Sequence, residues 1–313
     1  MNVLILSRTE IERLLDADAL AERLADAFRA VTAGEVEAPG RNQLRGPGEA
    51  FLLGMPGQTR DGPMAVKIVT LFEGNAARGI PAHLATIGLY DAETGACLAF
   101  MDGTYITAIR TSAAAALACD LLAREDARTL AIIGTGVQAE HHLRTFPRVR
   151  RFGEIRVVGS THDDAQRVAA GHPQARAVAD AEKAVRGADV VALTTNSARP
   201  VVEPAWVGPG AHVSSVGYRP PAGELPPELA RSARLFVETR AAFEPPPVGC
   251  AELQGLDDGA ELGEVLNGSR PGRTDPDEIT VYKAMGHVAE DIAAAELVYA
   301  AARREGVGTT VEL

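Results

Sequence analysis

The chain has 313 residues, of which 46% are hydrophobic and 23% are charged, as in a soluble globular protein large enough for two domains. Its formal net charge of -11 argues against nucleic acid or a membrane surface as a partner, because either would require a basic face. The three cysteines are sparse and form no metal-binding pattern, which fits a reducing cytoplasm. We expect neither a signal peptide nor an apolar run long enough to span a membrane.

The first part of the chain is predicted to combine helices with antiparallel strands. A capping box over 7–10 opens a helix whose apolar spacing continues to residue 33. Residues 83–90 and 97–102 flank a turn and predict a β-hairpin, and an alanine-rich helix follows over 106–123. Further extended segments are expected at 38–45, 51–56 and 65–71, the last with Lys67 inside an apolar run.

From Thr129 onward, strands alternate with helices, which is the pattern of a parallel, doubly wound sheet. The predicted fold class is therefore α/β, with a Rossmann domain over 121–290. A first domain of α+β type over 1–120 is completed by 291–313, where an amphipathic helix is expected to pack back. The strands of the second domain are expected at 130–133, 155–158, 190–194, 212–216, 235–237 and 279–282, with helices at 163–170 and 181–186.

A glycine turn, Gly134-x-Gly136-x-x-Ala139, joins the first of these strands to a helix. The first glycine permits a tight turn, the second lets the backbone approach a pyrophosphate, and the small third residue lets helix and strand pack. The helix start would direct free N–H groups at the phosphates. The alternative is an ordinary strand-to-helix turn, but the flanking strand and helix favour dinucleotide binding.

Motifs spread over nearly the whole chain together resemble the ornithine cyclodeaminase/mu-crystallin family. Members of that family use a nicotinamide cofactor on amino acids or their imines, and they form dimers through their first domains. The resemblance therefore implies an NAD(P)-dependent oxidoreductase and a homodimer. It also implies that the first domain, 1–120 with 291–313, is the substrate-binding and dimerisation domain. It rests on Leu53-Gly-Met-Pro56, Val66-Lys-Ile-Val69, His83-Leu-Ala-Thr86, Met101-Asp-Gly-x-x-Ile-Thr-Ala-x-Arg110-Thr, Gly134-x-Gly-Val-Gln-Ala139 and Val281-Tyr-Lys-Ala-Met-Gly286 with Glu290-Asp291.

The same resemblance supplies candidate substrate residues. It implies that Lys67 contacts the substrate carboxylate and moves a proton, whereas a lone lysine more often lies on the solvent face of an edge strand. Burial would depress the pKa of Lys67, which suits acid–base work. Arg110, placed in the first turn of its helix, and Arg41 are implied to clamp the carboxylate, with Arg45 as the substitute for Arg41. His83 matches a polar family position near the nicotinamide, although a histidine at a strand start is more often structural.

The position after the second strand bears on the choice of cofactor. NAD enzymes usually place an acid there to hold the ribose diol, but this chain has Gly159. Ser160, Thr161, His162 and Arg167 are available for a 2'-phosphate, so we expect NADP(H) rather than NAD(H), although no arginine follows the strand directly. The predicted cofactor-binding residues are Gly134, Gly136, Val137, Gln138, Ser160, Thr161, Thr194, Gly217 and Met285.

One loop departs from the cyclodeaminase pattern. Cyclodeaminases have an aspartate shortly after the residue that matches Gly217, but here Tyr218 and Arg219 follow, and the run resembles the mu-crystallin branch. We interpret the nearby Glu224 as structural. The predicted function is reduction of a ketimine to an L-amino acid, or the reverse oxidation. The alternatives are an ornithine cyclodeaminase and a non-catalytic cofactor-binding or ligand-binding protein. The adjacent pair at 141–142 consists of histidines that would not face each other on a helix, and we predict no metal site.

Overall fold

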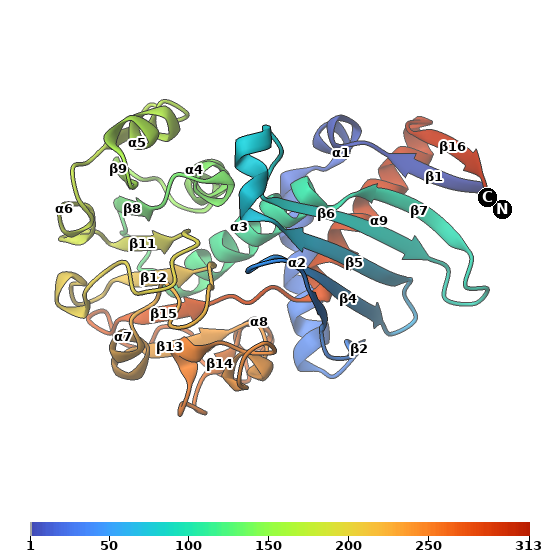
Figure 1. The fold of residues 1–313 in the computed structure, drawn as a ribbon. Helices are drawn as coiled ribbons and strands as arrows, with labels where there is room; N and C mark the ends of the chain where they lie inside the picture. Colours follow the sequence, from blue (N-terminus) through green and yellow to red (C-terminus); the bar gives the residue numbers. More distant parts are fainter. Residues whose placement is uncertain (1) are drawn as a thin grey trace. The chain divides into compact units, whose positions relative to one another are not determined.

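The computed structural model describes residues 2–313 and separates into two compact units (Figure 1). The first unit consists of residues up to Arg110 together with His287–Leu313, and the second is Thr111–Gly286. These limits fall close to the predicted domain boundaries at 120 and 290. The roles assigned to these ranges, substrate binding and dimerisation for 1–120 with 291–313 and dinucleotide binding for 121–290, stay predictions.

The first unit is built on one mixed sheet whose centre holds the strand with Lys67. The sheet order is β16-β1-β7-β6-β5-β4-β2, with β3 paired to β4; all pairs are antiparallel except β1 with β7. The predicted hairpin is confirmed as β6 and β7. The strands are β1 (Asn2–Leu6), β2 (Val36–Glu37), β3 (Asn42–Arg45), β4 (Phe51–Thr59), β5 (Met64–Leu71), β6 (His83–Tyr90), β7 (Cys97–Asp102) and β16 (Thr309–Glu312).

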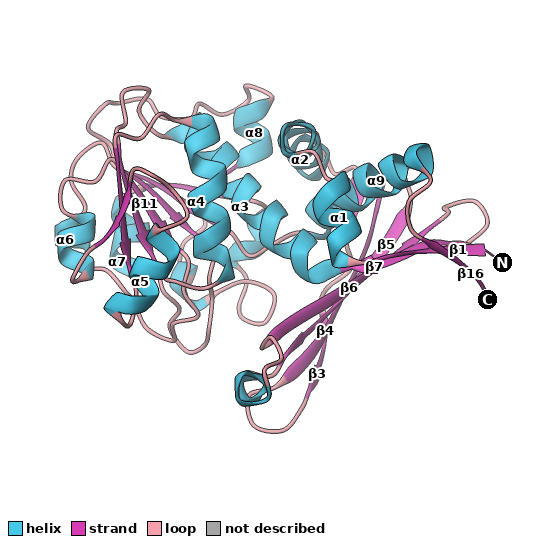
Figure 2. Ribbon diagram, turned by 90° about the horizontal axis from the view of Figure 1, so that it is seen from above, coloured by secondary structure: helices cyan, strands magenta, loops and turns pink. Residues whose placement is uncertain are grey.

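Three α-helices cover one face of this sheet (Figure 2). They are α1 (Arg8–Leu14), α2 (Ala17–Thr32) and α9 (Val288–Glu305), and α9 packs on α2 and on β4, β5 and β6. The single helix predicted to run to residue 33 is wrong, because Asp16 starts a second one. Its carboxylate accepts hydrogen bonds from the backbone N–H groups of Asp18 at 3.1 Å and Ala19 at 2.8 Å, which caps α2 and breaks the run. A short 3₁₀ helix covers Glu73–Arg78.

Helix α3 (Gly103–Leu122) bears on the expectation that the chain has no apolar run long enough to span a membrane. By length and composition alone, α3 is long and apolar enough to cross one. However, 72% of its apolar window is buried inside the structure. Core helices of soluble proteins pass the same test, since a helix buried on all sides is hydrophobic all round.

The second unit confirms the predicted doubly wound sheet. Its order is β10-β9-β8-β11-β12-β15-β13-β14, and every pair is parallel. The order reverses between β8 and β11, so ligands are expected at the carboxyl edge beside these two strands. The strands are β8 (Thr129–Ile133), β9 (Glu154–Val158), β10 (Ala175–Ala177), β11 (Val190–Leu193), β12 (His212–Ser215), β13 (Arg234–Val237), β14 (Ala260–Glu261) and β15 (Thr280–Lys283); the helices are α4 (Val137–Val149), α5 (His162–Ala169), α6 (Ala181–Val185), α7 (Pro227–Ser232) and α8 (Leu262–Leu266), with 3₁₀ turns at Pro204–Trp206, Arg240–Phe243 and Ala251–Leu253.

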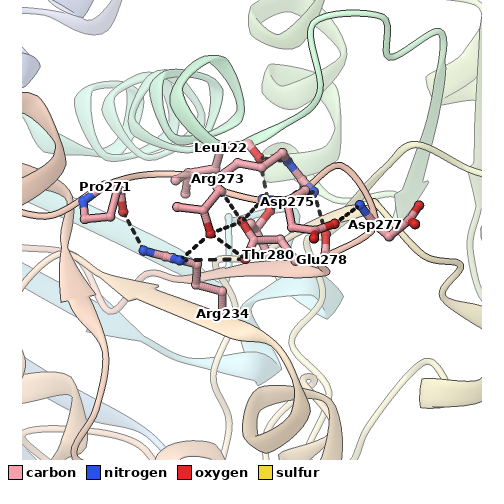
Figure 3. A network of polar contacts seen from close by, with 9 residues as sticks. Leu122, Arg234, Pro271, Arg273, Asp275, Asp277, Glu278 and Thr280 are labelled. Atoms are coloured by element: carbon pink, nitrogen blue, oxygen red, sulfur yellow. Dashed lines mark hydrogen bonds and ion pairs between the residues drawn. The ribbon is translucent and has the colours of Figure 1, made fainter.

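The amino edge of this sheet is fastened by a polar network centred on Arg273 (Figure 3). Its guanidinium donates to the carbonyl oxygens of Leu122 at 2.8 Å, Glu278 at 2.5 Å and Ala211 at 3.3 Å. One side chain thus ties the end of α3 to the segments that enter β12 and β15. The hydroxyl of Thr280 adds a hydrogen bond to the Leu122 carbonyl at 3.2 Å. We interpret this edge as structural because it lies opposite the carboxyl ends of the strands.

Replacing Arg273 by methionine is expected to lower the free energy of unfolding by about 2–4 kcal/mol, because several backbone carbonyls lose a charged donor. Urea unfolding followed by circular dichroism measures the change. The matched control is Arg270→Met, since Arg270 is exposed and lies 4.0 Å from Asp258. Equal unfolding midpoints for the two variants would contradict a structural role for the network.

Candidate active site

Four buried charged side chains form a cluster at the start of α9 in the first unit. Lys67 is 1% exposed and Arg110 4% exposed, and Glu290 and Asp291 are fully buried. The Lys67 Nζ atom lies 2.7 Å from Asp291 Oδ2, and Arg110 Nε donates to Asp291 Oδ1 at 3.1 Å. Arg110 Nη1 donates to Glu290 Oε2 at 3.1 Å. Because buried charges require partners, two cations are matched by two anions.

Local sequence explains why each group points into this cluster. Alternate residues of β5 face inward, so Ala65, Lys67 and Val69 are all buried. Since β5 lies between β4 and β6, the edge-strand alternative for Lys67 is wrong. The first-turn placement of Arg110 is also wrong, because α3 begins seven residues earlier, at Gly103, and Arg110 lies in the helix interior.

The two acids were not among the predicted site residues, although they belong to a motif that the sequence already displays. Glu290 Oε1 accepts a hydrogen bond from the backbone N–H of His287 at 2.6 Å and so forms the capping box of α9. Both carboxylates also favour the positive end of the helix. The available signal was two adjacent acids at the start of an otherwise apolar helix.

The cluster perturbs the ionisation of its members. Burial and the positive charge of Arg110 lower the pKa of Lys67 to about 8, against the opposing pull of Asp291. Burial would raise the pKa of Asp291, but Arg110 and Lys67 outweigh it and hold that pKa below its usual value. Burial, aided by Lys67 and Arg110, lowers the pKa of His83 to about 4. Lys67 can therefore exchange a proton near neutral pH while His83 stays uncharged.

Arg41 and His83 belong to the same neighbourhood. His83 feels the charges of both Lys67 and Arg110. The pKa of His287, the residue that caps α9, is lowered by burial and by the positive charges of Arg41 and Arg110. The structure thus brings the four predicted substrate residues within electrostatic reach of one cluster. Arg45, the substitute for Arg41, is exposed on β3.

In the second unit, the glycine turn leaves room for a phosphate. Gly134 has a φ of 127°, and a Cβ there would lie 2.5 Å from Thr194 Oγ1, so only glycine fits. A Cβ on Gly136 would meet no atom within 4 Å. Gly136 is the N-cap of α4 and makes no side-chain capping bond. The Cβ side of Gly136 therefore borders open space at the start of α4, and the turn fits a dinucleotide pyrophosphate.

The other predicted cofactor residues follow the carboxyl ends of parallel strands and so share this edge. The Thr194 hydroxyl donates to the Ile133 carbonyl at 2.9 Å. Thr161, next to exposed Ser160, caps α5 through the Asp164 N–H at 3.2 Å. Within α4, Val137 is 56% exposed, and the carbonyls of Val137 and Gln138 accept hydrogen bonds from His141 and His142. The Met285 N–H donates to Glu238 Oε2 at 2.8 Å.

A second buried network lies beneath the loop that contains Gly217. Lys283 Nζ lies 2.6 Å from Glu252 Oε2 and donates to the Gly217 carbonyl at 2.6 Å and to Ser215 Oγ at 3.1 Å. Glu224 accepts hydrogen bonds from the N–H groups of Gly217 at 2.7 Å and Thr195 at 2.6 Å. These contacts agree with the structural interpretation of Glu224.

In the loop after β9, a side chain at the position of the acid of NAD enzymes would require Thr135 to move. A Cβ on Gly159 would lie 2.4 Å from the Thr135 Cγ2 atom. Arg167 reaches over from α5, donates to the Thr135 carbonyl at 2.9 Å and pairs with Glu140 at 2.5 Å. Arg167 therefore borders the glycine turn, although it is already ion-paired with Glu140.

Comparisons with known proteins agree with this architecture. The family model described as ornithine cyclodeaminase/mu-crystallin family matches residues 1–306. The chain is 39% identical over 238 residues to the mouse (Mus musculus) ketimine reductase mu-crystallin, covering 75% of each chain. It is similar to the structure of Thermococcus litoralis Δ1-pyrroline-2-carboxylate reductase in complex with NADH and L-proline, with 33% identity, a TM-score of 0.91 and 99% and 100% of the two chains covered. An archaeal alanine dehydrogenase dimer with bound NAD gives 31% identity, a TM-score of 0.89 and complete coverage of both chains.

Proposed function

The chain belongs to the ornithine cyclodeaminase/mu-crystallin family, and from this premise we propose that it reduces a ketimine acid to an L-amino acid with a nicotinamide cofactor, or runs the reverse oxidation. The observation that carries the proposal is the buried Lys67 ammonium, paired with Asp291 beside Arg110. The relatives named as ketimine and pyrroline-2-carboxylate reductases support the same reaction class.

In the proposed mechanism, Arg110 and Arg41 hold the substrate carboxylate, for which the planar guanidinium group is suited. A nicotinamide bound through the glycine turn supplies the hydride in reduction or accepts it in oxidation. Lys67 Nζ donates a proton to the imine nitrogen and, in the oxidative direction, takes it back. Uncharged His83 serves as a hydrogen-bonding neighbour that adds no further positive charge. Holding the reacting groups in position accounts for much of the rate.

The loop after Gly217 favours the reductase over a cyclodeaminase. Tyr218 stands near the position of the cyclodeaminase aspartate, and its hydroxyl accepts a hydrogen bond from the Ala251 N–H at 3.3 Å. Its ring centroid lies 5.8 Å from the Lys283 ammonium. Tyr218 is thus fastened to the second buried network and offers no carboxylate to activate an amine or a water.

We propose NADP(H) as the cofactor, held by the residues predicted above. The support is the glycine at position 159 and the arginine at position 167 beside the glycine turn. An acid after β9 would repel a 2'-phosphate, whereas a guanidinium binds phosphate oxygens with charged hydrogen bonds.

If Arg167 contacts the 2'-phosphate, Arg167→Ala should weaken NADPH binding about tenfold or more, since one charged hydrogen bond is worth about 1.5–3 kcal/mol. NADH binding should change much less. Titration of cofactor fluorescence measures both dissociation constants. Arg186→Ala at the C-cap of α6 is the matched control, because Arg186 is exposed and pairs with Glu182. Equal weakening for the two cofactors would exclude Arg167 as the discriminating residue.

We propose a homodimer formed through the first unit. Leu44, Leu52, Thr70 and Leu84 lie side by side across β3, β4, β5 and β6. All three leucines of this row are at least 36% exposed. An exposed apolar row of this kind is typical of a protein interface, and light scattering of the purified protein checks the mass.

A paired assay tests the proposed function. One arm follows NADPH and NADH oxidation with pyrroline-2-carboxylate, piperideine-2-carboxylate, or pyruvate with an amine. The other arm follows ammonia release from L-ornithine with NAD. Cofactor oxidation without ammonia release is the expected result. Ammonia release with proline formation would overturn the reductase assignment, and ligand binding without turnover in either arm would favour the non-catalytic binding protein.

A further inference from the structure

The chain uses lysine very selectively. Lysine and arginine together number 31, and only three of these residues are lysines. Lys67 and Lys283 are buried, with at most 1% exposed, whereas Lys183 is exposed. Each buried lysine has a carboxylate partner, Asp291 for Lys67 and Glu252 for Lys283. The two pairs therefore invite comparison.

The buried ammonium groups of Lys67 and Lys283 differ in the number of partners that surround their N–H donors. Lys283 donates hydrogen bonds to Ser215 Oγ and to the Gly217 carbonyl and is also ion-paired with Glu252. Within residues 2–313, Lys67 has the single ionic partner Asp291. A buried ammonium whose N–H donors are not all used is costly unless a ligand accepts the remaining hydrogen bonds. Lys283 is thus a finished structural contact, whereas Lys67 is suited to a reacting group.

The two acids of the cluster also differ. Glu290 has a role in the helix itself, because it completes the capping box with the His287 N–H. Asp291 has no such role. Its oxygens contact Lys67 Nζ at 2.7 Å and Arg110 Nε at 3.1 Å. Beyond its favourable place at the positive end of the helix, the position of Asp291 is therefore explained by the two cations.

We propose that Asp291 is the positioning residue of the proton-donating Lys67: its carboxylate holds the ammonium charged and in place beside the carboxylate-binding Arg110. This inference rests on the proposed function, because the proton concerned is the one delivered to the imine nitrogen. In that step the Lys67 N–H bond breaks and an N–H bond forms on the substrate. The hydride reduces the imine carbon, and solvent returns a proton to neutral Lys67 before the next turnover.

The charges around Lys67 show why Asp291 is the residue that would keep its ammonium protonated. Arg110 on α3 disfavours the ammonium, as does burial itself, and uncharged His83 on β6 gives no compensation. Asp291 on α9 is the strongest group that opposes them, through both its charge and its hydrogen bond, and Glu290 is weaker. Without Asp291, Lys67 would lose its proton at a lower pH and would be mostly neutral when a substrate arrives.

Because the chain has three lysines, nuclear magnetic resonance can follow Lys67 directly. Protein grown with lysine labelled with carbon-13 at Cε gives three signals, which Lys67→Arg and Lys183→Arg assign. In the wild type the Lys67 signal should titrate near its pKa of about 8. In Asp291→Asn the midpoint should fall by about one to three pH units, the usual effect of losing an opposite charge at this distance. Glu290→Gln is the matched control and should move it less.

The kinetic arm asks whether the same ionisation governs the reaction. For imine reduction, kcat/KM should fall above the Lys67 midpoint, and Asp291→Asn should move that fall to lower pH by the same amount as the signal. The acid limb of amino-acid oxidation should shift equally. A residue with a merely structural role would lower the rate without moving either midpoint. Asp291→Glu, which keeps the charge, should restore most of the profile.

The outcomes separate the two proposals. An unchanged Lys67 midpoint in Asp291→Asn overturns the role of Asp291, whether or not the wild type is a reductase. A second outcome is that Asp291→Asn shifts the Lys67 midpoint while the wild type reduces no imine. That result supports the role of Asp291 in keeping Lys67 protonated and overturns the proposed function. If Asp291→Asn does not fold, Asp291→Ser leaves room for a water beside Lys67 and must show the same shift.

Discussion

Replacing Lys67 by methionine is expected to lower kcat/KM for imine reduction by about 10²–10⁴-fold, the usual contribution of a positioned proton donor. Methionine fills a similar volume without a charge, and Asp291 still has Arg110 as a partner. The fold should therefore persist, and NADPH binding should not change, since the cofactor residues lie on other elements. Steady-state kinetics with a cyclic ketimine acid and a fluorescence titration of NADPH measure the two effects.

Lys183→Met is the matched control, because Lys183 is exposed on α6 and pairs only with Asp180 among the described residues. A Lys67 variant with activity within tenfold of the wild type would remove Lys67 as the proton donor. A different result bears on the binding-protein alternative. If neither the wild type nor Lys67→Ala turns over substrate and both bind a ligand equally, the chain is a binding protein.

The second large effect is expected at Gly136. A Cβ there meets no atom of the protein within 4 Å, so the free energy of unfolding should fall by no more than about 1 kcal/mol, the typical cost of a poor N-cap residue. The same side chain would occupy the space that the pyrophosphate requires at the start of α4. NADPH affinity should fall about 100-fold or more, as expected for losing two charged hydrogen bonds.

Two other glycines make this test specific. A Cβ on Gly153 also meets no atom within 4 Å, but Gly153 precedes β9 at the opposite edge of the sheet, so Gly153→Val should leave affinity unchanged. Gly134→Val should differ from both, because its φ of 127° and the contact with Thr194 make the substitution strained. Unaltered NADPH affinity in Gly136→Val would contradict dinucleotide binding at this turn.

Elements set by local pattern were predictable, and elements set by distant partners were not. The β6–β7 hairpin and the strand–glycine–helix unit at Gly134 were read from periodicity and turn residues alone. Strands β1 and β16 pair with each other across the ends of the chain, and no local signal announces such a pairing. The break between α1 and α2 depends on one side chain, Asp16, whose capping bonds outweigh an otherwise continuous apolar spacing.

The candidate site also has a part that the sequence predicted and a part that depends on distant partners. The residue types at Lys67 and Arg110 indicated carboxylate binding, and the glycines indicated a nucleotide. The electrostatic balance was not foreseeable, because Asp291 and Glu290 follow Arg110 by about 180 positions. A reading based on cations alone predicts a strongly positive pocket. The folded cluster is neutral before substrate binds, so the proton state of Lys67 depends on its acidic neighbour.

The scarcity of lysine has a practical consequence for handling this protein. Reagents that acylate amines would find one accessible lysine side chain, Lys183 on α6, since the other two are buried. A dye, a spin label or a solid support joined there would have one attachment point among the lysines. Because α6 packs against β8 and β9, such a label would report on the nucleotide-binding sheet without modifying either buried ammonium.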